Sequence, residues 1–255
     1  MYKQLDRGGA TNLIDASDLE WLKLNYPGVY YVAAKNVLQG CLWFRMSYSV
    51  SVGKGLINPD EKTNFKDGHS IEDAYALTIE FDKLQLRTRV MEEGGRILRT
   101  KNKWKLTFAD VHMYEDGSLC LCPEPEERIL FSTGIKLRPF FYNILIPYFY
   151  YQSYLERFGK EPWRSSSHGE LGILESYGNQ LFSSPSFEPV NIYLKYLTTT
   201  TEKTILRNNP IKHDDLCLCN SGKIFSDCHV DAFDGYKKLF SDFMSLKPKK
   251  RSRQN

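Results

Sequence analysis

Four of the six cysteines in this 255-residue chain lie in two Cys-x-Cys triplets, at residues 120–122 and 217–219. A cysteine thiolate is both a soft metal ligand and a nucleophile, so each triplet is a candidate for metal binding or covalent chemistry. The second triplet opens the pattern C-x-C-x-S-G-x5-C-H, in which Ser221-Gly222 lets the backbone turn. Three sulfurs and one imidazole form the closed tetrahedral set that structural zinc prefers. The sequence therefore predicts a Zn²⁺ site with four ligands: Cys217, Cys219, Cys228 and His229.

The first triplet, at 120–122, has no comparable set of ligands in the sequence around it. His112 is the nearest candidate, and a four-ligand site would need a distant partner such as His168. The turn signal Asp116-Gly117 places the triplet at the edge of a loop, where a partly exposed thiol can ionise and attack a carbonyl or a thioester. Two interpretations stay open: a nucleophilic cysteine, or two buried cysteines that act as small hydrophobic residues.

The elements that must position the first triplet are predicted from apolar spacing. Residues 13–24 have the spacing of a helix, with Thr11 and Asn12 as possible caps. Residues 36–50 and 73–81 are rich in β-branched and aromatic residues, which predicts two antiparallel strands separated by a polar loop.

The segments after the first triplet are predicted to be mainly helical. Residues 139–158 read as a buried aromatic helix that ends at Gly159, and residues 160–179 as a loop that runs into a short helix. A linker at 183–189 and a helical segment at about 190–206 lead to the second triplet. This order of elements indicates an α+β fold with a small C-terminal module.

The charge of the chain is unevenly distributed. The formal net charge is +3, and the last stretch, "KPKKRSRQN", carries five basic residues, so the remainder has a formal charge of −2. The body thus lacks the broad basic surface that general nucleic-acid binding requires, and we expect no nucleic-acid partner. The tail is either a solvated terminus or a site of weak attraction to an acidic partner.

The sequence also bears on the cellular compartment. The first residues, "MYKQLDRGGA", lack the apolar core of a secretory signal peptide. The richest apolar run, at 139–155, is interrupted by Asn143, Pro147 and Gln152 and is too short to cross a bilayer. We therefore expect a cytoplasmic protein without a membrane partner, whose cysteines serve metals or catalysis instead of disulfides.

The second triplet carries the first of two family resemblances. The stretch "CLCNSGKIFSDCH" resembles the SEC-C motif, a small zinc knuckle found at the ends of bacterial proteins. One departure is Asn220, where the family usually has glycine. The resemblance implies zinc and a docking role, not chemistry.

The first triplet carries the second resemblance. The stretch "HMYEDGSLCL" resembles the active-site segment of ubiquitin-conjugating enzymes, in which a histidine is followed by a turn and then by G-x-I-C-L. The matching positions are His112 and residues 117–121. The upstream "RVMEEGGRILR", an extended piece and a Gly-Gly turn, and the downstream "PW…HGELGILESYG" are similar to bacterial relatives of that family. Those relatives occur in antiphage defence operons, including operons that encode nucleotide cyclases.

This resemblance, which spans about residues 13–179, implies a fold and a reaction. The implied fold is an N-terminal helix, an antiparallel meander and C-terminal helices. In the implied reaction, Cys120 takes the acyl group of a ubiquitin-like protein, or of another partner such as a nucleotide cyclase, from a separate activating enzyme. A target amine then attacks the thioester, with His112 or an acidic group assisting. Met113 and Tyr114 replace the family's Pro-Asn, so oxyanion support must come from elsewhere. Cys122 is a bystander, a resolving thiol or the nucleophile itself.

Rival interpretations and domain limits complete the expectations. A catalytically silent ubiquitin-conjugating fold with a zinc docking knuckle is the main alternative, and a cysteine hydrolase is a third. An alkylating reagent that labels Cys120 well before Cys41 would favour an enzyme. The predicted domains are a ubiquitin-conjugating-enzyme-like domain, a linker with a helix, the SEC-C motif and a basic tail, at residues 1–182, 183–210, 211–240 and 241–255.

Overall fold

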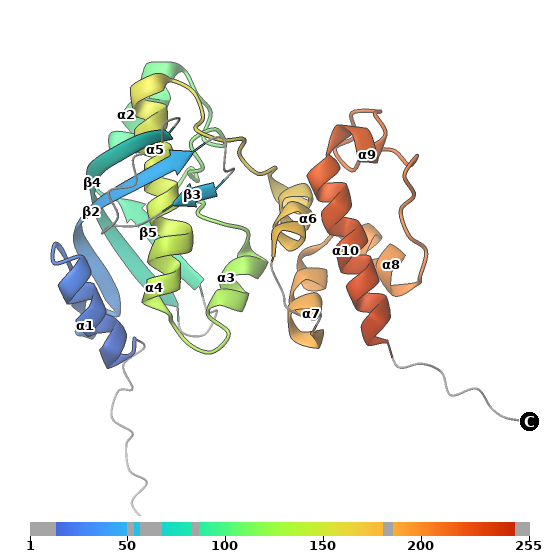
Figure 1. Ribbon diagram of the computed structural model, residues 1–255, viewed down its shortest axis with the longest axis horizontal. Helices are drawn as coiled ribbons and strands as arrows, with labels where there is room; N and C mark the ends of the chain where they lie inside the picture. Colours follow the sequence, from blue (N-terminus) through green and yellow to red (C-terminus); the bar gives the residue numbers. More distant parts are fainter. Residues whose placement is uncertain (1–13, 50–53, 57–67, 83–86, 181–185, 248–255) are drawn as a thin grey trace, which may run out of the picture. The chain divides into compact units, whose positions relative to one another are not determined.

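The computed structural model in Figure 1 divides into two compact units. The first unit consists of Met1–Leu121 and Leu130–Trp163, and the second of Cys122–Ile129 and Arg164–Asn255. The domain boundary predicted from the sequence follows residue 182, whereas the helix at 169–179 belongs to the second unit. The structure describes residues 14–49, 54–56, 68–82, 87–180 and 186–247.

The first unit is built on an antiparallel sheet of strand order β1-β2-β4-β5, with β3 paired to the end of β2. The strands are β1 (Val29–Val32), β2 (Val37–Ser49), β3 (Lys54–Leu56), β4 (Gly68–Asp82) and β5 (Arg87–Glu92). The predicted strands at 36–50 and 73–81 are confirmed as β2 and β4, which pair along their length. Together with the helices below, this sheet confirms the predicted α+β class.

One face of this sheet is buried and the other is open, as the alternation along β2 requires. Leu42 and Phe44 are buried, whereas Cys41 and Trp43 are exposed. Because Cys41 is exposed, the expectation that an alkylating reagent labels Cys120 well before Cys41 has to be corrected. A reagent that reaches both Cys41 and Cys120 does not separate an enzyme from a silent module by the order of labelling alone.

The buried face of the sheet is covered by α5 (Ile146–Phe158), as Figure 1 shows. Phe149 of α5 stacks on Tyr75 of β4 with ring centroids 4.5 Å apart. The predicted helix at 139–158 is confirmed, and Gly159 closes it in the left-handed conformation with φ +68°. The helix is not uniform, because α4 (Leu137–Phe140) and a π-helical segment (Phe141–Leu145) precede α5.

The predicted N-terminal helix is confirmed as α1 (Ala16–Asn25). The expected caps at 11–12 lie outside the described residues, and Asp15 caps the helix by accepting a hydrogen bond of 2.9 Å from the Ser17 N–H. Asp18 ties this helix to α4, because its carboxylate accepts from the Leu137 N–H at 2.9 Å.

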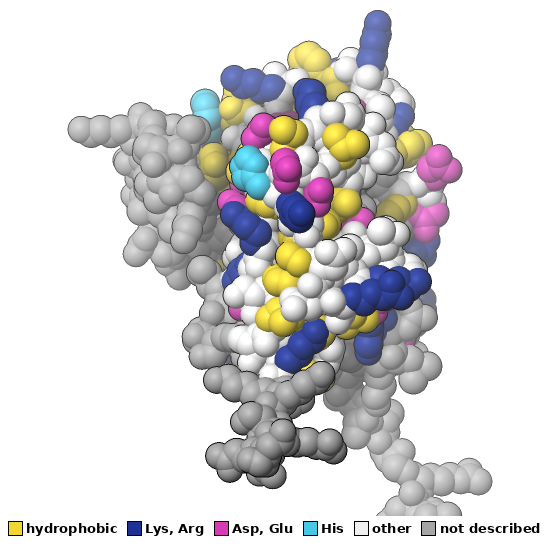
Figure 2. Space-filling view, turned by 90° about the vertical axis from the view of Figure 1, so that its right-hand side faces the viewer, with side chains coloured by type: hydrophobic (Ala, Val, Ile, Leu, Met, Phe, Trp, Pro, Cys, Tyr) yellow, Lys and Arg dark blue, Asp and Glu magenta, His cyan; other side chains and the backbone are white. Residues whose placement is uncertain are grey.

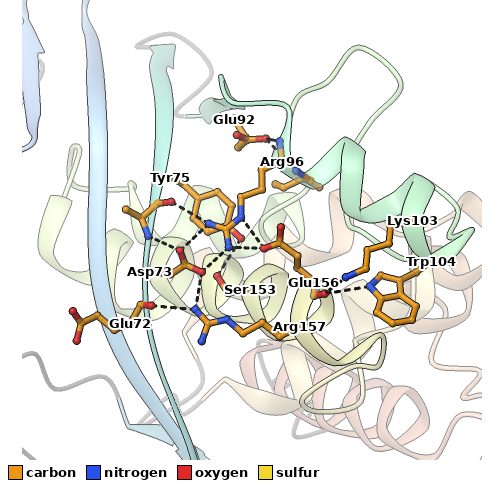
Figure 3. Close-up of polar contacts among 12 residues, drawn as sticks. Glu72, Asp73, Tyr75, Glu92, Arg96, Lys103, Trp104, Ser153, Glu156 and Arg157 are labelled. Atoms are coloured by element: carbon orange, nitrogen blue, oxygen red, sulfur yellow. Dashed lines mark hydrogen bonds and ion pairs between the residues drawn. The ribbon is translucent and has the colours of Figure 1, made fainter.

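A helix that the sequence analysis did not anticipate, α2 (Arg96–Trp104), follows β5. The Glu92 carboxylate accepts from the first N–H of this helix at 2.6 Å. The Arg96 guanidinium makes two hydrogen bonds of 2.7 Å to Asp73 on β4 and another of 2.7 Å to Glu156 on α5, as Figure 3 shows. Such a bidentate, charge-assisted arrangement connects three elements at one point.

The charge network around Asp73 has an electrostatic consequence. Burial acts to raise the pKa of Asp73, but hydrogen bonds from Arg96 and from the Ala74 N–H outweigh it and lower this pKa to about 2. Arg157 adds an ion pair of 3.1 Å to the same carboxylate. The carboxylate is therefore ionised at neutral pH and contributes to stability there.

The second unit is helical. Its helices are α3 (Glu124–Leu130, whose last residue belongs to the first unit), α6 (Gly169–Asn179), α7 (Phe187–Tyr196), α8 (Thr199–Leu206), α9 (Phe225–Cys228) and α10 (Val230–Leu246). The predicted short helix after 160 is confirmed as α6. The segment predicted to be helical near 190–206 consists of two helices, α7 and α8, and α7 begins at Phe187, inside the predicted linker at 183–189. In the view of Figure 2, hydrophobic side chains are interspersed with charged and histidine side chains.

The core of the second unit forms where α6 and α10 meet. A Cβ atom at Gly235 would lie 1.8 Å from the Leu174 carbonyl oxygen, so the glycine is required for this close approach. Tyr177 and Tyr193 pack edge to face with centroids 4.9 Å apart. Within the residues that the structure describes, no helix has the length and apolar character needed to span a membrane.

Candidate functional site

The second triplet and its partners form a compact cluster in the second unit. The ligand atoms of the four predicted residues lie within 4.8 Å of one another. Cys217 Sγ is 3.2 Å from His229 Nδ1, and Cys219 Sγ is 3.6 Å from Cys228 Sγ. Two sulfurs that share a tetrahedral zinc ion at 2.3 Å would be separated by about 3.8 Å. The four residues are therefore close enough together to hold one metal ion.

Local backbone structure brings these ligands together. Leu216 and Ile224 form an antiparallel bridge, and the Cys217 N–H donates to the Lys223 carbonyl at 2.8 Å. Between them the chain reverses through Asn220 (φ +58°) and Gly222 (φ +75°), both in the left-handed region. Asparagine tolerates this region better than most residues with a Cβ atom, so the chain can turn at Asn220 without a glycine.

The remaining two ligands come from the junction of α9 and α10. Cys228 is the last residue of α9, and His229 stands between the two helices. Phe225, at the start of α9, is buried and packs edge to face on Phe233 of α10 at 5.3 Å. The cluster thus rests on an aromatic contact that orients α9.

The two cysteines of the second triplet differ in acidity. Burial raises the pKa of the Cys217 thiol to about 11. The hydroxyl and N–H of Ser221 lower the pKa of the Cys219 thiol to about 7. Cys219 therefore ionises more readily than Cys217, and a bound cation would favour the thiolate form of both.

A tight turn in the first unit precedes the first triplet, whose Cys120 belongs to that unit and whose Cys122 belongs to the second. The Gly117 N–H donates to the Tyr114 carbonyl at 3.0 Å, and Gly117 has φ +84°. Asp116 Oδ1 accepts from the Ser118 N–H at 2.9 Å, which closes a second, side-chain turn. The expected turn at Asp116-Gly117 is confirmed. Hydrogen bonds from Ser118 and from Arg89 lower the pKa of Asp116 to about 2.

After this turn the chain runs along the edge of the sheet. The Leu119 N–H donates to the Val90 carbonyl of β5 at 2.9 Å, and Ser118 bridges Met91 in antiparallel fashion. Cys120 comes next, and its thiol is neither fully buried nor fully exposed. Cys120 and Cys122 both have intermediate burial, so neither is a fully buried core residue.

His112 and Cys120 are joined through their main chains. The Cys120 N–H donates to the His112 carbonyl at 2.8 Å. His112 itself has φ +46°, an uncommon conformation for a residue with a Cβ atom. Its imidazole lies edge to face with the Tyr151 ring at 5.5 Å.

His168, weighed above as a distant partner of the first triplet, belongs to the second unit, where it precedes α6. Beside it, the Ser167 N–H and hydroxyl both donate to the Glu175 carboxylate, at 2.7 and 2.6 Å. Gly172 makes the fit possible, because a Cβ atom there would lie 1.9 Å from the Ser167 carbonyl oxygen. This loop is thus fixed by its own hydrogen bonds.

A groove of about 1110 Å³ lies beside the turn that precedes Cys120. Its lining includes Ser118 and Leu119, together with residues from the start of β2, the end of β4 and the start of β5. Arg89 crosses this lining and pairs with Asp116 at 3.2 Å and with Glu80 at 3.8 Å. The groove therefore presents charges of both signs close to the thiol segment.

Comparisons of the chain with protein-family models, with curated proteins and with solved structures found no significant match. The two resemblances therefore rest on the residues quoted for them. Arg89 and the α5 side chains that contact residues 110–112 could not be recognised from the sequence, because no local pattern marks residues that approach a site from a distant strand or helix.

Proposed function

We propose that this protein is a ubiquitin-conjugating-like acyl transferase whose nucleophile is Cys120. The observation that carries the proposal is the half-buried Cys120 thiol, which follows a closed turn at the edge of an antiparallel sheet beside a groove. The order of helix, meander, irregular cysteine segment and helices is also the order that the resemblance implies. The acyl donor is a ubiquitin-like protein, or another partner with a suitable C-terminus such as a nucleotide cyclase.

The proposed reaction has two steps. The Cys120 thiolate attacks the C-terminal carbonyl carbon of the donor, which arrives as a thioester on a separate activating enzyme; a new C–S bond forms and the activating enzyme's thiolate leaves. An amine of the protein target then attacks this carbonyl, Cys120 leaves as thiolate, and the amine gives up its proton to His112, an acidic group or water. The lining of the groove includes Leu119, the neighbour of Cys120, and we propose the groove as the path of the donor's extended C-terminal tail.

The departure from the family's Pro-Asn affects stabilisation of the oxyanion. The Cys120 N–H donates to the His112 carbonyl and is therefore committed in this conformation. Support for the oxyanion must come from other donors, such as further N–H groups or a side chain of the partner. We expect transfer to depend strongly on the activating enzyme and the target, which can supply such donors.

For the cluster in the second unit we propose Zn²⁺ as the bound ion. Three sulfurs and one imidazole match the ligand preference of structural zinc, and all four positions are taken by the protein, as in a closed structural site. The ion would then organise the knuckle as a docking surface without taking part in the reaction. We place the protein in bacterial antiviral defence, on the basis of the resemblance alone.

The transferase proposal is tested with non-reducing gels of the full-length chain incubated with the activating enzyme and the modifier encoded in the same operon. We expect a thiol-sensitive adduct with the wild type and with Cys122→Ser. Cys120→Ser should form none, or a stable oxyester instead. If Cys120→Ser retains the adduct and Cys122→Ser loses it, the nucleophile is Cys122.

The second candidate function is a catalytically silent binding module with a zinc docking knuckle. It is favoured by Met113 and Tyr114 in place of the Pro-Asn pair and by the commitment of the Cys120 N–H. The same gels decide between the two functions. If the activating enzyme is charged but the wild type, Cys120→Ser and Cys122→Ser all form no adduct, the silent module is supported.

A further inference from the structure

Three side chains of α5 contact the loop at residues 110–112, which precedes the segment of residues 118–120 that carries Cys120 (the thiol segment). They stand at positions i, i+3 and i+4 and therefore share one face of the helix. Their polar groups donate to three successive main-chain carbonyls at distances of 2.8 to 3.2 Å. The pairs are Tyr151 with Asp110, Tyr148 with both Val111 and His112, and Gln152 with Val111.

The two hydrogen bonds to the Val111 carbonyl are buried, whereas those to the Asp110 and His112 carbonyls are partly buried. Gln152 is 1% exposed and Tyr148 is 7% exposed. A hydrogen bond in such an environment is stronger than at the surface. The Val111 and His112 carbonyls both accept from Tyr148 and from one further donor, which is Gln152 for Val111 and the Cys120 N–H for His112. The main chain of residues 110–112 is therefore held firmly from the side of the helix.

The consequence reaches Cys120 through His112. The His112 carbonyl accepts from the Tyr148 hydroxyl at 3.1 Å and from the Cys120 N–H at 2.8 Å. A residue with a Cβ atom keeps a left-handed conformation only when its surroundings hold it there. Tyr148 thus holds the acceptor on which the main chain of Cys120 depends.

We propose that Tyr148 and Gln152 are positioning residues for the Cys120 thiol. Neither takes part in bond making; both fix the carbonyls of the preceding loop and thereby the direction in which the sulfur is presented. As a statement about transfer, this inference rests on the proposed function. As a statement about the thiol, it can be measured on the chain alone.

A matched control lies on the same helix. Tyr150 is fully buried, and its hydroxyl donates to the His69 carbonyl at 2.8 Å, away from the thiol segment. Tyr148→Phe and Tyr150→Phe each remove one buried hydroxyl that is bonded to main-chain carbonyls and keep the aromatic ring. A general loss of stability affects both variants, whereas loss of positioning affects only Tyr148→Phe.

The experiment compares these two variants in the full-length chain, with Gln152→Met as a second test of positioning. The rate of Cys120 alkylation by iodoacetamide is followed by mass spectrometry of the peptide that contains it, across a range of pH. Loss of one hydrogen bond shifts a local equilibrium about fivefold, so we expect alkylation about fivefold faster in Tyr148→Phe, because the loosened segment exposes the sulfur. Tyr150→Phe should match the wild type.

The second measurement is a single turnover of transfer from the charged activating enzyme to Cys120. Transfer requires an oriented thiol, so we expect Tyr148→Phe and Gln152→Met to be slower by at least about tenfold and Tyr150→Phe to be unaffected. If the wild type accepts no acyl group while the alkylation contrast holds, the proposed function fails and positioning stands. Equal alkylation rates in Tyr148→Phe and Tyr150→Phe overturn the inference.

Discussion

The two Cys-x-Cys triplets are held in place by different means. The ligands of the second triplet lie within thirteen residues and are brought together by one turn and one short helix. The first triplet has no comparable set of metal ligands in the sequence around it. The position of its Cys120 is set by main-chain hydrogen bonds to β5 and to the loop at residues 110–112, and this loop is in turn held by side chains of α5. A local site can be recognised from spacing alone, whereas a site supported from a distance cannot.

The largest expected effect concerns metal removal from the second triplet. We expect about one zinc per chain in protein purified without chelator, and Cys228→Ser should lose it. Ligation supplies on the order of 10 kcal/mol to a knuckle of this kind, so the metal-free segment around residues 215–229 should unfold. Zinc content and hydrogen exchange of this segment are the measurements.

Cys41→Ser is the control for that substitution, because Cys41 is an exposed cysteine on the sheet of the first unit. It should leave the zinc content unchanged. If the wild-type protein contains no zinc, the proposed difference between the two triplets is wrong, since neither would then be a metal site.

The next effect tests the long-range support of the first unit. Arg96→Ala removes a guanidinium that is bonded to both Asp73 and Glu156 and leaves two carboxylates without it. We expect the free energy of unfolding to fall by about 2–3 kcal/mol, because the site is only partly buried. Arg99→Ala, an exposed position on the same helix, should change it by less than about 0.5 kcal/mol. If urea unfolding shows that Arg96→Ala and Arg99→Ala lower the free energy of unfolding equally, the network does not stabilise the first unit as described.

The same network predicts a pH dependence. The pKa of Asp73 in the folded protein is about 2, below the value of about 3.9 for an unfolded chain, so its stabilising contribution is present above pH 4. This contribution disappears as the pH falls from about 4 to 2, where Asp73 becomes protonated. The stability difference between the wild type and Asp73→Asn, measured by urea unfolding at pH 6 and pH 3, should narrow at the lower pH. A constant difference contradicts the assigned pKa.

The smallest effect sharpens the role of His112. Its φ of +46° suits asparagine better than alanine, so His112→Asn should be more stable than His112→Ala by about 0.5–1 kcal/mol in thermal unfolding. Equal stabilities would mean that the left-handed conformation is not maintained. Both variants lack the imidazole, so a loss of transfer activity in both would assign a catalytic role to that ring. A loss of transfer activity in the alanine variant alone would assign the effect to the backbone conformation of residue 112.

The sequence predicted the features that depend on short-range patterns. The β-branched and aromatic composition of β2 and the apolar, aromatic run of α5 indicated one strand and one helix, and the Cys/His spacing indicated the knuckle. It did not predict α2, whose start depends on the Glu92 carboxylate and on a left-handed Gly95. Nor did it show that α10 continues to Leu246, past the predicted end of the knuckle at residue 240.

For the candidate thiol site, the turn at Asp116-Gly117 was predictable because aspartate and glycine favour such turns. The support from Tyr148 and Gln152 was not, since these residues lie 28 and 32 positions after Cys120. In the sequence, Tyr148 belongs to an apolar run and Gln152 is only an interruption of it. The left-handed conformation of His112 was also hidden, because histidine does not mark such a position as glycine does.

The most direct test of the central claim is to locate the acyl group on the chain itself. Wild-type protein is charged with the activating enzyme and modifier of the same operon, quenched at low pH and digested, and the peptides are analysed by mass spectrometry. The account predicts the C-terminal residues of the modifier in thioester linkage to Cys120, with the four ligands of the knuckle unmodified. An acyl group on Cys122 or on a cysteine of the knuckle, or none on any cysteine while the activating enzyme is charged, would contradict it.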